Sequence, residues 1–134
     1  MTLDITPLTN VVTRLREGLA RYKHEPHDDQ LRDGLIQRFD FTYELSHKML
    51  RRQLSETAAS PDEIATMAFP DLIRLGNAQG LLNSEWPVWR RFREMRTRTT
   101  HTYNATTAAE VAAAVPGFLK EAEHLLAELQ KRNP

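Results

Sequence analysis

The sequence predicts an all-α protein, an antiparallel up-and-down four-helix bundle with a short extra helix, and three observations support this prediction. Only five glycines occur in 134 residues. Apolar residues recur at intervals of three or four, which is the spacing of one helical face. No stretch of any length alternates apolar and polar residues as a half-buried strand would. A chain of 134 residues suits one hydrophobic core, so we expect residues 1–134 to form a single domain.

Two apolar stripes predict the first two helices. The second begins after Asp28 and Asp29, whose negative charges suit a helix N-terminus, and extends to Leu54. It is wider than one neighbouring helix requires, which favours a contact with another subunit. The first stripe ends before Pro26 and consists of Leu8, Val11, Leu15, Leu19 and Tyr22.

Capping patterns predict where the later helices begin. Ser60, followed by Pro61 and by Glu63 three residues on, indicates the start of a short helix, and a second short stretch opens at Phe69. We expect Ser84 to cap the next helix, which should end in the threonine-rich residues 97–102 because β-branched residues lower helix propensity.

The last helix is predicted from a further pattern of this kind. Thr107 and Glu110 form a capping-box pattern at its start. Pro116 lies in the middle of its apolar stripe and should kink it, because proline removes one backbone hydrogen bond.

Composition and charge exclude several classes of protein. Eighteen Lys and Arg balance eighteen Asp and Glu, so the formal net charge is zero and a uniformly basic nucleic-acid coat is excluded. The absence of Cys excludes a disulfide framework, a cysteine–zinc site and a thiol nucleophile. No apolar run approaches the roughly 20 residues that span a bilayer, and no signal peptide is visible. We therefore expect a cytoplasmic protein without membrane contact.

The sequence contains no convincing pattern for a metal or for a glycine-built phosphate cradle. Neither G-x-G-x-x-G nor G-x-x-x-x-G-K-[ST] is present. The Gly-Ser and Asp-x-Asp signature with which nucleotidyltransferases bind metal is also missing. His24 and His27 have a metal-like spacing but flank Pro26, which favours solvated loop histidines over a metal site. We expect no bound metal.

One segment, residues 89–103, carries an unusual concentration of arginine. Between residues 90 and 98 the chain has five arginines and one acid, a local charge of +4 in a neutral protein. The planar guanidinium fork of Arg matches phosphate oxygens, so the segment is a candidate RNA- or nucleotide-binding surface. The alternative is a solvated basic face paired with acids elsewhere. The arginines are Arg90, Arg91, Arg93, Arg96 and Arg98.

Three residues at the end of this segment have the chemistry of phosphate transfer. Arg96 can stabilise developing negative charge, and His101, five positions later, can move a proton near neutral pH. Tyr103 supplies a hydroxyl that can bind or accept a nucleotide. A histidine at a helix end also commonly caps a carbonyl, so the R-x4-H spacing alone is a weak signal.

Several segments together resemble the HEPN superfamily, specifically its HepT-like and nucleotidyltransferase substrate-binding branch. Residues 35–48 resemble the first signature of that branch, and residues 78–82, followed by Trp89, resemble its Ala-x-Gly-Leu-Ile stretch. Residues 96–103 resemble its R-x4-H-x-Y motif. The resemblance extends over about residues 8–129.

The resemblance implies a helical bundle that forms a homodimer around the R-x4-H segment. It also implies a separately encoded partner, a minimal nucleotidyltransferase called MNT, which acts as the antitoxin. The HEPN protein of such a toxin–antitoxin pair is a metal-independent ribonuclease that the partner silences by transferring AMP from ATP to the motif tyrosine. By this resemblance Arg96 and His101 are catalytic, Tyr103 is modified, RNA is the substrate, and the chain needs no cofactor beyond the partner's ATP.

Two positions differ from the pattern of this branch. Active HEPN ribonucleases often have Asn, Asp or His directly after the arginine, where this chain has Thr97, and the first signature usually has an aromatic residue in place of His47. Tyr43 and Glu44 lie in the same signature and are candidate site-lining residues, with core packing and a surface carboxylate as the alternatives.

Two classes of function therefore remain open. One is a ribonuclease toxin silenced by AMPylation. The other is a non-catalytic subunit that binds a substrate or nucleotide for a partner nucleotidyltransferase. The same residues would serve both functions.

Overall fold

The computed structural model describes residues 2–134, and every regular element in this range is helical. This confirms the predicted all-α bundle, and the insert, its short extra helical part, consists of the two predicted pieces, which begin after Ser60 and at Phe69. None of the described helices is long and apolar enough to cross a membrane. The elements are α1 (Thr6–His24), α2 (Asp29–Thr57), α3 (Pro61–Ala65), α4 (Phe69–Ala78), α5 (Trp86–Thr97), the 3-10 helix η1 (Arg98–His101) and α6 (Ala105–Arg132).

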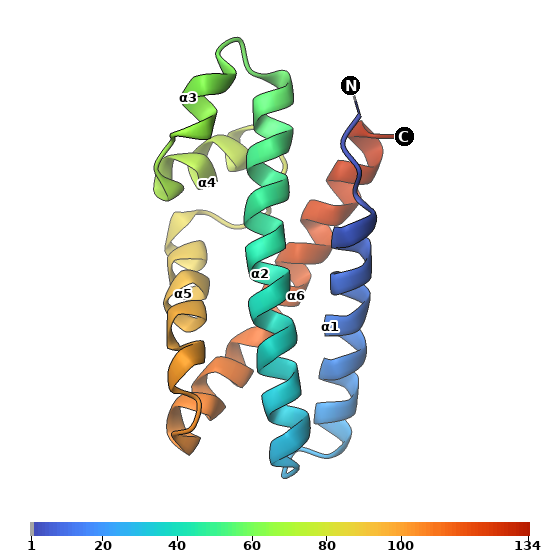
Figure 1. The fold of residues 1–134 in the computed structure, drawn as a ribbon, viewed down its shortest axis with the longest axis vertical. Helices are drawn as coiled ribbons and strands as arrows, with labels where there is room; N and C mark the ends of the chain where they lie inside the picture. Colours follow the sequence, from blue (N-terminus) through green and yellow to red (C-terminus); the bar gives the residue numbers. More distant parts are fainter. Residues whose placement is uncertain (1) are drawn as a thin grey trace.

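The four long helices alternate in direction (Figure 1). α1 descends from the end that holds both termini, α2 returns beside it, α5 descends again, and α6 rises back to the termini. The short helices α3 and α4 lie beside the upper half of α2, before α5 begins. The Leu3 amide donates to Asn133 Oδ1 at 2.8 Å, which ties the two ends of the described chain together.

The core lies where α1, α2, α5 and α6 face one another. Phe39 of α2 and Phe118 of α6 are fully buried and meet edge to face at a ring-centroid distance of 5.0 Å. Trp89 of α5 packs on Phe118 at 6.0 Å and brings α5 into the same core. On α1 the core-facing valine is Val12 rather than the predicted Val11, which is only partly buried.

The structure corrects two of the predicted helix caps. Asn104 caps α6 by accepting hydrogen bonds from the backbone amides of Thr106 and Thr107, so Thr107 lies inside the helix and does not cap it. The N-cap of α5 is Glu85, not Ser84. Ser60 does occupy the N-cap position of α3, but its side chain makes no capping hydrogen bond.

A buried carboxylate holds the backbone of Asn83 and Ser84 in the loop before α5. Glu121 of α6 is only 2% exposed and accepts hydrogen bonds from the backbone amides of Asn83 and Ser84, at 2.8 and 2.9 Å, and from Trp89 Nε1 at 3.1 Å. The loop before α5 is thereby fixed on α6. Because buried carboxylates are stable only when their acceptor capacity is used, these three donors account for its burial.

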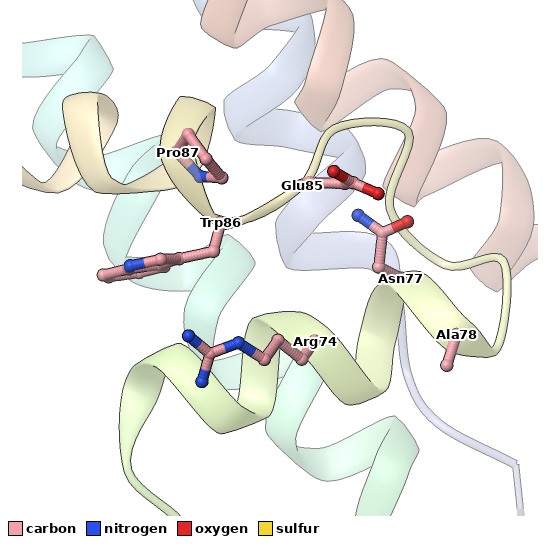
Figure 2. A pocket seen from close by; sticks show the side chains of 6 residues that line it. All are labelled: Arg74, Asn77, Ala78, Glu85, Trp86 and Pro87. Carbon is pink, nitrogen blue, oxygen red and sulfur yellow. The ribbon is translucent and has the colours of Figure 1, made fainter.

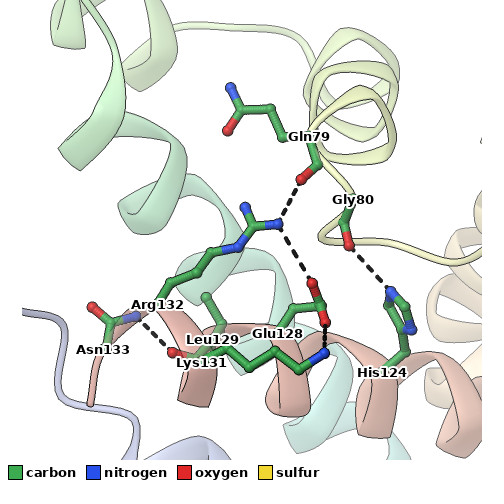
Figure 3. A network of polar contacts seen from close by, with 8 residues as sticks. All are labelled: Gln79, Gly80, His124, Glu128, Leu129, Lys131, Arg132 and Asn133. Carbon is green, nitrogen blue, oxygen red and sulfur yellow. Dashed lines mark hydrogen bonds and ion pairs between the residues drawn. The ribbon is translucent and has the colours of Figure 1, made fainter.

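A second polar network fixes the end of α4 on the last turns of α6 (Figure 3). Arg132 donates to the Gln79 carbonyl oxygen at 2.6 Å, and the His124 ring nitrogen lies 3.2 Å from the Gly80 carbonyl oxygen. Gly80 has a φ of +77°, a left-handed conformation that glycine adopts without steric cost. The two networks hold the insert, and with it the start of α5, against α6.

Candidate functional site

The threonine-rich segment is an ordered end to α5. Thr97 Oγ1 donates to the Arg93 carbonyl oxygen at 3.0 Å, and Thr99 Oγ1 donates to the Arg96 carbonyl oxygen at 2.8 Å. Both bonds lead back to carbonyl oxygens in the last turns of α5, where the α-helix becomes η1. The Thr97 hydroxyl is therefore engaged with its own helix. The prediction that the helix ends among the threonines is confirmed.

Two carboxylates of α2 orient Arg96. Its Nε donates to Asp40 Oδ1 at 2.9 Å, and its Nη2 lies 3.8 Å from Glu44 Oε2. The Arg96 side chain remains 40% exposed, so the guanidinium is held in place while part of its surface faces solvent. Asp40 was missed in the sequence, although its carboxylate lies one helical turn before Glu44 and on the same face of α2.

His101 and Tyr103 lie together just beyond this arginine. His101 ends η1 and is exposed, and Tyr103 follows in the turn before α6 with 88% exposure. Their rings meet edge to face with centroids 6.1 Å apart. A hydroxyl this exposed on a large aromatic side chain is accessible to another macromolecule.

The other four arginines have different surroundings. Arg90 pairs with Glu94 at 3.4 Å, and Arg98 pairs with Glu110 of α6. Arg93 extends over the ring of Phe69, with its guanidinium carbon 5.5 Å from the ring centroid, a cation–π geometry. Arg91 is exposed and has no ion pair among the described residues. A solvated, acid-paired face therefore describes Arg90 and Arg98 but not Arg91 and Arg93.

Tyr43 and His47 lie on the inner side of the same region. Tyr43 is 6% exposed and packs against Phe118 at 6.0 Å, and its burial raises the pKa of the hydroxyl to about 12 despite nearby Arg93 and Arg96. Tyr43 is thus a core residue beside the site, whereas Glu44 reaches its surface. Burial, followed by the charges of Arg51, Arg93 and Arg96, lowers the pKa of His47 to about 4.

The two histidines with a metal-like spacing, His24 and His27, lie in a different part of the molecule. His24 ends α1, and His27 lies in the α1–α2 turn, where both are exposed. Within residues 2–134, no three His, Asp or Glu side chains are grouped so that they could hold a metal ion.

A pocket lies between α4 and the start of α5 (Figure 2). The Asn77 side-chain amide donates to the Ser84 carbonyl oxygen, and Arg74 pairs with Asp71 at 3.0 Å. The polar groups of both residues thus have partners within the chain, and no residue of the Arg96 segment lines this pocket. Its lining residues are Arg74, Asn77, Ala78, Glu85, Trp86 and Pro87.

Comparison with known proteins identifies the family of this chain. A family model described as nucleotidyltransferase substrate binding protein like matches residues 3–131. The chain belongs to this family. It is 41% identical over 105 residues to a Haemophilus influenzae protein named probable ribonuclease HepT, covering 78% of this chain and 71% of that protein.

A solved structure supports the same assignment. The structure of HI0074 from Haemophilus influenzae, described as the fold of a substrate binding domain of a nucleotidyltransferase, superposes with a TM-score of 0.89 at 32% identity. The match covers 95% of this chain and 99% of that one. The HepT-like and nucleotidyltransferase substrate-binding resemblance read from the sequence is confirmed.

Proposed function

We propose that this protein is a HepT-like, metal-independent endoribonuclease of a HEPN/MNT toxin–antitoxin pair. Its partner, a minimal nucleotidyltransferase, silences it by transferring AMP from ATP to Tyr103. The observation that supports this best is the arrangement at the end of α5. There Arg96 is oriented by Asp40 at 2.9 Å, and the next turn presents exposed His101 beside exposed Tyr103.

The proposed reaction needs only groups that this chain supplies. A ribose 2′-hydroxyl loses its proton and attacks the adjacent phosphorus, the bond from phosphorus to the 5′-oxygen breaks, and that oxygen takes up a proton. The products are a 2′,3′-cyclic phosphate and a 5′-hydroxyl. His101 takes or gives one of these protons, and Arg96 stabilises the negative charge that develops on the phosphate oxygens.

RNA cleavage by the purified, partner-free chain tests this reaction. Cleavage should persist in EDTA, because the acid–base group and the phosphate ligand are both side chains. Arg96→Ala should lower the rate by about 10²–10³-fold through lost charge stabilisation. Arg16→Ala is the matched control, since Arg16 is also held by a carboxylate, Glu123 at 2.9 Å, but on α1. Equal rates for the two variants would contradict the assignment of Arg96.

Coexpression with the partner tests the silencing step. Intact mass should show added AMP on the wild-type chain, and Tyr103→Phe should prevent it and keep cleavage active in the presence of the partner. Tyr22→Phe is a suitable control, because Tyr22 is a partly buried residue of α1. AMP on the Tyr103→Phe chain would contradict Tyr103 as the acceptor.

The predicted homodimer would place two R-x4-H segments beside one RNA strand. Its support is the family resemblance and the exposed side chains of Arg96 and His101, which leave the motif open to a second copy. Light scattering of the partner-free chain at micromolar concentration should give twice the chain mass. A monomer would contradict this arrangement.

The second candidate is a non-catalytic subunit that binds a substrate or nucleotide for the partner nucleotidyltransferase. The family description favours it, as does Thr97, whose hydroxyl is bonded to the Arg93 carbonyl oxygen instead of facing the site. This candidate predicts nucleotide or RNA binding that depends on Arg96 without any cleavage by the unmodified protein.

A further inference from the structure

α2 and α5 lie side by side (Figure 1), and we call the surface along which they meet the α2–α5 seam. It leads away from the proposed catalytic residues toward α3. Because the two helices are antiparallel, Asp40 faces Arg96, and His47, two turns further along α2, is close enough to Arg93 for that charge to affect its pKa. His47 and Arg93 also contact the same ring, that of Phe69, at 4.5 and 5.5 Å. Side chains in contact with one another or with the same ring thus follow the seam from Arg96 to His47.

Beyond His47 the seam opens into a hollow of about 550 Å³ between α2 and α3, which we call the α2–α3 hollow. Two acids, Glu44 and Glu56, line it together with three permanently charged bases. Glu44 is already near Arg96, at 3.8 Å from its Nη2. The basic lining residues are Lys48, Arg51 and Arg52, with His47 beside them.

Arg51 is a fixed part of this hollow. Its Nη1 donates to the carbonyl oxygens of Ile64 and Met67, at 2.7 and 2.9 Å, and its Nη2 lies 3.1 Å from His47 Nε2. Neutral His47 therefore accepts at Nε2 and carries its proton on Nδ1. Among residues 2–134 Arg51 forms no ion pair, so no carboxylate is bonded to its guanidinium at the floor of the hollow.

His47 reports the electrostatic potential at this point. Burial is the first cause of its lowered pKa, and the charges of Arg51, Arg93 and Arg96 lower it further, while only Glu44 acts in the opposite direction. At His47 the charges of Arg51, Arg93 and Arg96 therefore outweigh that of Glu44, even though the whole chain is neutral. A groove lined by basic side chains that follow the backbone is a usual surface for a single-stranded nucleic acid.

We propose that a single strand of RNA held at Arg96 and His101 continues along the α2–α5 seam, and that Lys48 and Arg52 bind its phosphates at the α2–α3 hollow. This extension rests on the proposed ribonuclease or RNA-binding function. Lys48 and Arg52 are both exposed, lie one helical turn apart, and form no ion pair among the described residues.

The length of the seam suits several nucleotides. Asp40 and Arg52 are separated by twelve residues of α2, or about 18 Å at the helical rise of about 1.5 Å per residue. The phosphates bound at the hollow would belong to nucleotides beyond the scissile one. The strand would therefore be held at two places, which are the cleavage segment and the hollow.

RNA binding by a cleavage-deficient chain tests this inference. In a His101→Ala background, Lys48→Gln/Arg52→Gln should weaken binding of a labelled single-stranded 12-mer about tenfold near 0.15 M salt. It should also reduce the log–log salt slope by roughly 1.4, which is two phosphate contacts at about 0.7 each. The matched control, Arg21→Gln/Lys23→Gln, removes the same charge from the far end of α1, where both residues are exposed.

A second readout does not depend on any substitution in the hollow. Saturation with the 12-mer should raise the pKa of His47, because bound phosphates oppose the arginine charges. This pKa is measured by NMR of the His47 ring. The exposed His24 and His27 should not follow it. The mononucleotide AMP should produce a smaller rise than the 12-mer, because a strand anchored at Arg96 occupies the hollow more fully.

The outcomes separate this inference from the proposed function. Equal affinities and salt slopes for the hollow and control variants would overturn it, as would a His47 pKa that RNA leaves unchanged. An AMP effect equal to that of the 12-mer would overturn the RNA path in favour of a mononucleotide site. Binding that depends on the hollow, without cleavage by the wild type, would retain the path and reject the ribonuclease.

Discussion

The two ends of α5 differ in how their polar groups are satisfied. At the N-terminal end, the buried Glu121 takes up three donors from the preceding loop and from Trp89, and it is 2% exposed. At the C-terminal end, Arg96 is 40% exposed and Tyr103 is 88% exposed. One end uses its polar groups to fix the helix, and the other presents them to solvent. A fixed start thus allows α5 to position an exposed site at its other end.

Removing the buried carboxylate should give the largest change in stability. Glu121→Ala leaves the amides of Asn83 and Ser84 and the Nε1 of Trp89 without their acceptor. It should lower the unfolding free energy by about 3 kcal/mol. Glu123→Ala, two positions away on α6, removes only the exposed ion pair with Arg16 and should cost less than about 1 kcal/mol. Urea unfolding measures both.

If Glu121→Ala and Glu123→Ala lowered the unfolding free energy by similar amounts, the contrast between the two ends of α5 would be contradicted. Glu121→Gln provides an additional check, because its carbonyl oxygen can still accept from the loop amides. Its cost should lie between the costs of the other two variants. A Glu121→Ala variant as stable as the wild type would mean that the loop is held by other contacts.

His47, in the α2–α5 seam, should make the stability of the fold depend on pH. The pKa of His47 is lowered to about 4, so between its ordinary value of 6.5 and about 4 the unfolded chain binds a proton that the folded chain does not. Stability contributed by neutral His47 is therefore lost as pH falls through this range. From pH 7 to pH 5 the loss should be about 1 kcal/mol, reduced from the full linkage value because His47 is only half-buried.

His47→Phe is the variant that isolates this effect. It keeps a ring against Phe69, which His47 contacts at 4.5 Å, and removes the titrating group. The difference in unfolding free energy between pH 7 and pH 5 should be smaller by about 1 kcal/mol in the variant. An identical pH dependence in the two proteins would show that His47 titrates normally in the folded state.

The sequence predicted the parts of this molecule that depend on local pattern. The apolar stripes located α1 and α2, and Asp28 caps α2 by accepting from the amides of Gln30 and Leu31. Where several capping residues stand close together, local pattern was insufficient. Asn104 was overlooked in favour of Thr107, because the capping-box spacing fits Thr107 and Glu110 but the helix begins three residues earlier.

Contacts between distant residues could not be predicted from one sequence. Glu121 appears as an ordinary polar position of a helix until the fold brings the amides of Asn83 and Ser84 to it. Asp40 and Arg96 are 56 residues apart, so their ion pair follows only from the antiparallel packing of α2 and α5. The R-x4-H-x-Y motif was visible in the sequence because it is local and because the family resemblance gave it a meaning.

The most direct test of the proposed function is RNA cleavage by wild type and His101→Ala, each purified without the partner and shown by mass to be unmodified. His101→Ala should cleave about 10²–10⁴-fold more slowly, because a general acid or base is lost. Its unfolding free energy should stay within about 0.5 kcal/mol of the wild type, because His101 is exposed. If wild type and variant are equally inert, the ribonuclease proposal is contradicted and the binding-subunit function stands.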